Sequence, residues 1–161
     1  MAKSPAEKSA AGTRDADRNL SMTRSFAAPR EAVFAAWTDP AAIARWMSPW
    51  GTASASVDLR IGGSFRLVMA DEHLSIEHTG VYRSIEPPKL LVFTWRSEFT
   101  GLRDTLVTLR LSEVGAHQTE LELTHEFATD AEASSHAGGW SQILTRLETF
   151  LESRPRGAEH T

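Results

Sequence analysis

The side chains best suited to bind or react with a small molecule are two histidines, His125 and His136, and the tryptophans near them. His125 alternates with Leu121 and Leu123 along a strand pattern, so its imidazole should point to the apolar side of that strand. His136 precedes Trp140 by one helical turn and should face the same way. An inward imidazole can anchor the polar group of a ligand or act as a general acid or base. The alternative to such a functional role is that His125 and His136 are neutral histidines of the core, each hydrogen-bonded to a neighbouring residue.

Other kinds of chemistry lack the residues they need. There is no cysteine, which excludes disulfides, thiolate metal sites and a cysteine nucleophile. His73 and His78 do not have the spacing of a metal site, so no metal is predicted. The chain has no nucleophile elbow, phosphate-binding glycine loop or dinucleotide fingerprint. No cofactor and no catalytic residue are therefore assigned from the sequence.

Length and charge narrow the class of protein further. A chain of 161 residues with a net charge of -4 suggests one globular domain, and its scattered basic residues predict neither nucleic-acid nor membrane binding. The apolar runs are too short to span a bilayer, and the N-terminus lacks the apolar core of a signal peptide. The expected location is the cytoplasm.

The element that must position His136 is a long helix predicted from about Thr129 to Ser153. Thr129 and Glu132 have the spacing of a capping box. The apolar stripe of this helix comprises Trp140, Ile143, Leu144, Leu147 and Leu151. Gly138 and Gly139 lie inside the predicted helix just before Trp140, although each glycine costs about 1 kcal/mol relative to alanine. Either helix and sheet pack closely there, or the missing side chains leave part of a ligand cavity. Gly139→Leu is expected to overpack the helix and to destabilise the protein.

The rest of the chain reads as one sheet with two short helices. A first strand is expected at Leu20–Phe26, followed by helices that carry Trp37 and Trp46. Six strands in succession then extend from residue 53 to residue 127, which favours an antiparallel sheet covered by the long helix, an α+β fold. The predicted domain spans residues 19–153, and residues 1–18 and 154–161 are expected to be disordered tails.

Several local strings carry a resemblance to a known family. They are Ala28-Pro29-Arg30-Glu31-Ala32-Val33-Phe34, Trp37-Thr38-Asp39-Pro40, Asp58-Leu59-Arg60-Ile61-Gly62-Gly63-Ser64-Phe65, Gly80-Val81-Tyr82, Pro87-Pro88-Lys89-Leu90-Leu91-Val92-Phe93-Thr94-Trp95 and His136-Ala137-Gly138-Gly139-Trp140. In this order they resemble the activator of 90-kDa heat-shock protein ATPase homologue-like family, within the START-like superfamily. The resemblance implies a helix-grip fold, a curved antiparallel sheet wrapped around the C-terminal helix with an apolar cavity between them.

Three functions remain open at this point, because this fold serves many activities. The first is binding of an apolar or amphipathic small molecule by a cavity. The residues predicted to contact that molecule are Trp46, Phe65, Phe93, Trp95, His125, His136, Trp140 and Leu144. The others are a co-chaperone that activates an ATPase, with a chaperone as partner, and a cyclase- or hydrolase-type enzyme that uses His125 or His136. A homodimer also stays open.

Overall fold

The structure is a computed structural model that describes residues 19–127 and 129–153. The tails predicted at residues 1–18 and 154–161 lie outside the described residues. In chain order the elements are β1 (Asn19–Phe26), α2 (Arg30–Thr38), α3 (Pro40–Trp46), β2 (Thr52–Val57), β3 (Ser64–Ala70), β4 (Ser75–Glu86), β5 (Leu90–Trp95), the 3-10 helix η1 (Glu98–Thr100), β6 (Thr105–Gly115), β7 (Gln118–Glu126) and α4 (Asp130–Glu152).

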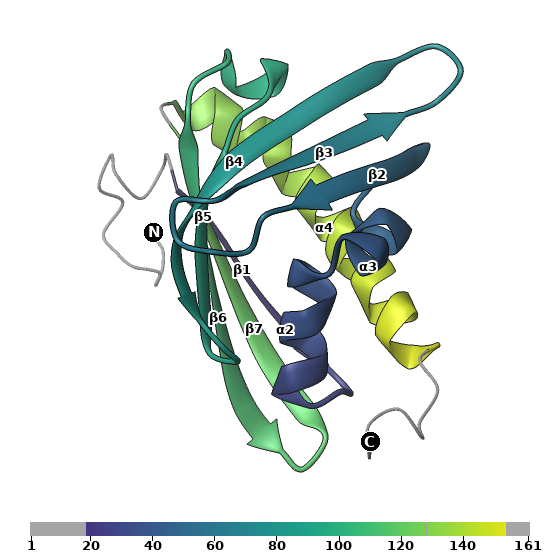
Figure 1. The fold of residues 1–161 in the computed structure, drawn as a ribbon, viewed down its shortest axis with the longest axis vertical. Helices are drawn as coiled ribbons and strands as arrows, with labels where there is room; N and C mark the ends of the chain where they lie inside the picture. The colour runs from purple at the N-terminus through teal and green to yellow at the C-terminus, as the bar shows by residue number, and fades with distance from the viewer. Residues whose placement is uncertain (1–18, 128, 154–161) are drawn as a thin grey trace, which may run out of the picture.

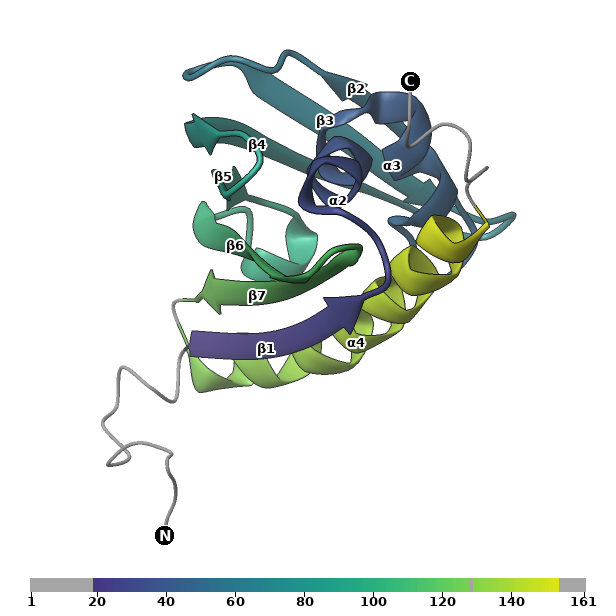
Figure 2. The same cartoon turned by 90° about the horizontal axis from the view of Figure 1, so that it is seen from below.

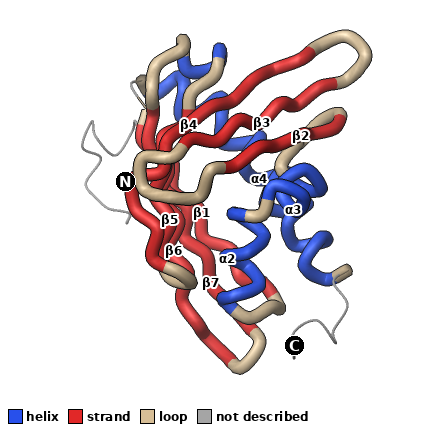
Figure 3. The backbone as a smooth tube through the Cα atoms, in the orientation of Figure 1, coloured by secondary structure: helices blue, strands red, loops and turns tan. Residues whose placement is uncertain are grey.

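The seven strands form one antiparallel sheet in the order β1-β7-β6-β5-β4-β3-β2 (Figure 1). Successive strands from β2 to β7 pair as neighbours, and β1 pairs with β7 along its whole length. The sheet curves, and the three α-helices gather on one side of it (Figures 2 and 3). This arrangement confirms the predicted helix-grip fold.

The helix starts follow from local hydrogen bonds. Asp39 ends α2 and caps α3, because its carboxylate accepts from the Ala41 amide at 3.1 Å. Thr129 caps α4 by accepting from the Glu132 amide at 3.2 Å, which confirms half of the predicted capping box. The Glu132 carboxylate bonds Arg103 instead of completing the box. This ion pair ties the first turn of α4 to the loop before β6.

Alternating positions on the strands supply the sheet's half of the core, as their apolar pattern predicts. Leu121, Leu123 and His125 are all fully buried on β7, and the buried face of α4 packs in the same cluster. Each fully buried apolar side chain contributes roughly 1.5–3 kcal/mol. Gly80 lies opposite Phe65, and a Cβ there would overlap both the Phe65 ring and the Thr94 carbonyl oxygen. Only glycine allows this close approach.

Two local features add to the sequence-based expectation. Pro29 precedes α2 as its N-cap residue. The short helix η1 between β5 and β6 was not predicted, because three residues are too few to show a helical period. In the described part of the chain, no helix has both the length and the hydropathy that crossing a membrane would require.

Candidate functional site

A pocket of about 410 Å³ lies where the first half of α4 faces the adjoining ends of β3, β4 and β5. Its apolar lining comprises Trp50, Met69, Trp95, Phe99, Trp140 and Ile143. Its polar lining comprises His78 and His136 inside, and the exposed Ser135 and Gln142 at the rim. The volume is within the range of small-molecule sites, which are mostly apolar with a few polar groups. We call this space the larger pocket.

Gly139 is part of the wall of the larger pocket. A Cβ added at Gly139 or at Gly138 would have nothing within 4 Å. Close packing of helix on sheet at these glycines, and with it the expected overpacking by Gly139→Leu, is therefore wrong. The missing side chain at Gly139 leaves open space beside Trp140, as the cavity interpretation expects.

His125 lies beneath Trp140 in a buried chain of hydrogen bonds. The Trp140 indole N–H donates to His125 Nδ1 at 3.0 Å, which places the ring proton of His125 on Nε2. That nitrogen is 2.7 Å from the Thr105 hydroxyl oxygen, and the hydroxyl donates to the Trp95 carbonyl oxygen at 2.6 Å. Both ring nitrogens are thus satisfied within the protein. Burial, reinforced by His136, lowers the pKa of His125 to about 2, so the ring is neutral.

His136 is held in one tautomer by its own helix. Its Nδ1 lies 2.8 Å from the Glu132 carbonyl oxygen, which can only accept, so Nδ1 carries the proton. Its Nε2 is buried and has no hydrogen-bond partner in the described part of the chain. Burial lowers the pKa of His136, against the opposing effects of the Glu132 carbonyl and carboxylate. Nε2 is therefore a free acceptor.

His78 on β4 lies across the larger pocket and is 4% exposed. Its ring centroid is 4.8 Å from that of Trp95 and 6.5 Å from that of Phe99. Burial and, second, the proximity of His136 lower the pKa of His78 to about 4, against the opposing effect of the nearby Ile76 and Leu67 backbone groups. Two further buried atoms of this wall, His78 Nδ1 and Trp95 Nε1, have no hydrogen-bond partner among the described residues. Trp95 Nε1 can therefore bond a molecule that enters the pocket, whereas the His78 ring lies beside those backbone acceptors.

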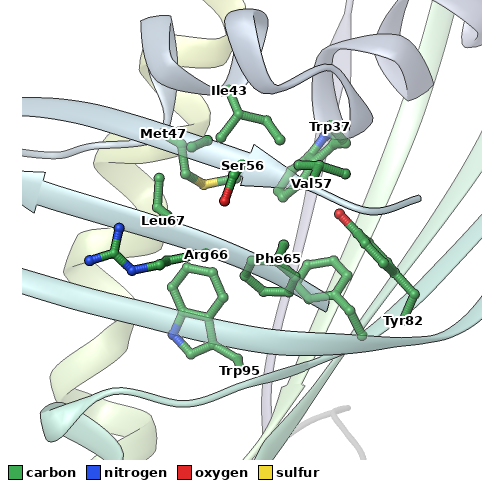
Figure 4. A pocket seen from close by; sticks show the side chains of 12 residues that line it. Trp37, Ile43, Met47, Ser56, Val57, Phe65, Arg66, Leu67, Tyr82 and Trp95 are labelled. Atoms are coloured by element: carbon green, nitrogen blue, oxygen red, sulfur yellow. The ribbon is translucent and has the colours of Figure 1, made fainter. Parts of the chain in front are cut away.

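A second, smaller pocket lies between β2 and β3 on one side and α2 and α3 on the other, and its volume is about 20 Å³ (Figure 4). That is room for about one water molecule. Aromatic side chains fill this region, with the Phe65 and Phe93 rings perpendicular and 5.4 Å apart between centroids. The smaller pocket is a packed part of the core and does not offer space for a ligand.

The eight residues predicted to contact a ligand separate into three groups. Trp95, His136 and Trp140 line the larger pocket. Phe65 and Phe93 line only the smaller one. Trp46, His125 and Leu144 are fully buried and line neither pocket. The apolar period of a strand or helix identifies its inward face. It does not distinguish an inward residue that lines a cavity from one that is packed among other core side chains.

His78 and Phe99 line the larger pocket and were missed. His78 shares the inward face of β4 with Ile76 and Tyr82, so the same alternation that singled out His125 could have found it. In the sequence, His78 stands out only through its spacing from His73, which is not that of a metal site. Phe99 is 51% exposed and lies on η1, where no periodic pattern marks it.

Among the described residues that line the larger pocket, no serine is activated as a nucleophile by a histidine. Ser135 Oγ lies 3.4 Å from His136 Nδ1 but donates to the Glu132 carbonyl oxygen at 3.0 Å. Nδ1 already carries a proton and cannot take one from Ser135. Within residues 19–127 and 129–153, no group of three or more potential metal-ligating side chains is found. What the geometry offers is an apolar space with hydrogen-bonding groups on one wall.

The family model described as Activator of Hsp90 ATPase homolog 1-like protein matches residues 27–152, most of the chain. The chain belongs to this family. Proteins with the fold of this family commonly bind hydrophobic ligands. A comparison with curated proteins found no match.

Solved structures of similar proteins agree with this assignment. CalU16 from Micromonospora echinospora is 32% identical with a TM-score of 0.66, over 84% of this chain and 76% of that one. A Rhodobacter sphaeroides protein is 27% identical with a TM-score of 0.75, over 86% and 95%. Protein NE0264 from Nitrosomonas europaea is 24% identical with a TM-score of 0.74, over 86% and 96%, and shares the fold.

Proposed function

We propose that this protein binds an apolar or amphipathic small molecule in the larger pocket. The observation that carries the proposal is the pocket itself, about 410 Å³ bounded by three indoles and widened by Gly139. Trp50, Trp95 and Trp140 offer broad apolar faces, and burying apolar surface of a ligand is favourable by roughly 25 cal/mol per Å². Phe99, Ser135 and Gln142 place the rim at the protein surface, so a ligand can reach the pocket.

The adjacent glycines provide a matched pair of variants. Gly139 lines the larger pocket, whereas Gly138 is exposed and does not. Because neither added Cβ meets another atom within 4 Å, leucine at either position should gain helix propensity without a clash. Only the leucine at position 139 projects into the pocket.

The test is the binding of N-phenyl-1-naphthylamine, a neutral apolar fluorophore, to the folded full-length chain. We expect saturable binding to the wild type and to Gly138→Leu, and loss of binding by Gly139→Leu with an unchanged or raised melting temperature. Equal affinities of the two leucine variants for the fluorophore would show that it binds outside the larger pocket. No binding to the wild type by this probe or by the smaller naphthalene would contradict the proposal.

A further inference from the structure

Three residues in the wall of the larger pocket carry polar atoms that the described part of the chain leaves unpaired. They are His136 Nε2, His78 Nδ1 and Trp95 Nε1, all buried and without a hydrogen-bond partner among the described residues. Leaving such an atom unpaired is costly. Water can pair these atoms in the free protein, and a ligand that displaces the water binds well only if it reproduces those hydrogen bonds.

The chemistry of the three atoms restricts the group that can do so. His136 Nε2 is an acceptor, because Nδ1 donates to the Glu132 carbonyl oxygen. Trp95 Nε1 can only donate. The site therefore presents an acceptor and a donor together, and a hydroxyl group is the smallest of the common neutral groups that can both donate and accept. A carbonyl or ether oxygen satisfies the donor alone.

The charges around the wall disfavour an anion. Burial lowers the pKa of both His78 and His136, so neither supplies a cation at neutral pH. The Glu132 carboxylate is one helical turn from His136, and the Arg103 guanidinium already pairs with it. A carboxylate ligand would be repelled by the lone pair of His136 Nε2 and by the nearby Glu132 carboxylate.

We infer that the larger pocket selects a neutral aromatic ligand that bears a hydroxyl group, as a phenol or a naphthol does. The hydroxyl donates to His136 Nε2 and accepts from Trp95 Nε1, while the indoles of Trp95 and Trp140 contact the aromatic body. This inference rests on the proposed function and narrows it to a class of ligand.

Four compounds that share the naphthalene ring test it by displacement of N-phenyl-1-naphthylamine at pH 7: naphthalene, 2-methoxynaphthalene, 2-naphthol and 2-naphthoate. We expect 2-naphthol to bind at least about fivefold more tightly than naphthalene, with 2-methoxynaphthalene between them, since one hydrogen bond to an otherwise unpaired group is worth that much. We expect 2-naphthoate to bind more weakly than 2-naphthol.

The variant His136→Phe removes the acceptor and keeps an aromatic ring against Phe127, whose centroid is 4.5 Å away. In it the preference for 2-naphthol over naphthalene should fall below about twofold, while naphthalene affinity changes little. His73→Phe is the control, since the His73 side chain is 85% exposed and lies outside the pocket. The comparison of compounds on the wild type stands even where His136→Phe does not fold.

The outcomes separate this inference from the proposed function. Equal affinities for naphthalene and 2-naphthol would overturn the inference and leave the proposed function intact. Affinity for 2-naphthoate equal to that for 2-naphthol would overturn it too, because it would show a cationic site. Absence of binding by all four compounds and by the fluorophore would remove the proposed function itself.

Discussion

Thr105→Val removes one oxygen from the buried chain that connects Trp140, His125 and Thr105. The Thr105 hydroxyl accepts from His125 at 2.7 Å and donates to the Trp95 carbonyl oxygen at 2.6 Å. Valine keeps the shape of the side chain but leaves both of those groups unpaired. Each buried unpaired group costs about 1–3 kcal/mol, so we expect a loss of about 2–5 kcal/mol in the free energy of unfolding.

The assay is urea unfolding followed by circular dichroism, with Thr108→Val as the control. Thr108 is three residues along the same strand and half-buried, and its side chain makes no hydrogen bond that the structure shows. Its replacement should change the free energy of unfolding by less than about 0.5 kcal/mol. A Thr105→Val variant as stable as the control would refute the reasoning that His125 is a structural histidine held by this chain.

Two further outcomes follow from burial. The pKa of His125 is about 2 in the folded protein against 6.5 for an unperturbed ring. Below pH 6.5 the His125 ring therefore binds a proton in the unfolded chain but not in the folded one, and the free energy of unfolding decreases as the pH is lowered. Between about pH 6 and 4 the wild type should lose about 1.4 kcal/mol per pH unit more than His125→Phe, as measured by urea unfolding at each pH, and equal slopes would contradict a buried neutral ring. Gly80→Ala should lower the free energy of unfolding by about 1–3 kcal/mol, because the added Cβ overlaps the Phe65 ring and the Thr94 carbonyl oxygen. Gly115→Ala should lower it less, since a Cβ there meets only ordinary contacts. Equal melting temperatures for the two variants would argue against the close approach at Gly80.

The sequence predicts the fold well because its elements are set by local chemistry and periodicity. The Asp39-Pro40 pair marks the boundary between α2 and α3, and Thr129 marks the start of α4. Strict alternation along β7 places His125 inward, and the structure confirms that orientation. These signals need only the near neighbours of each residue.

The site is predicted less completely because a cavity is a property of packing. Phe65 and Trp95 both belong to the inward faces of their strands, yet Phe65 contacts Phe93 and Trp95 in a filled core while Trp95 also borders open space. Which inward side chain meets the open space depends on the volumes of residues distant in the sequence. Gly139 is the exception, since a glycine inside the predicted helix, directly before Trp140, is visible in the sequence.

The most direct measurement for the central claim uses the indole N–H signals of the five tryptophans in a ¹H–¹⁵N correlation spectrum. Trp50, Trp95 and Trp140 line the larger pocket, whereas Trp46 is fully buried outside it, with its N–H bonded to the Ala36 carbonyl oxygen at 3.0 Å. On titration with 2-naphthol we expect the signals of Trp50, Trp95 and Trp140 to shift saturably and that of Trp46 to stay in place. Saturable shifts of Trp46 with unchanged Trp95 and Trp140, or no saturable shift at all, would contradict ligand binding in the larger pocket.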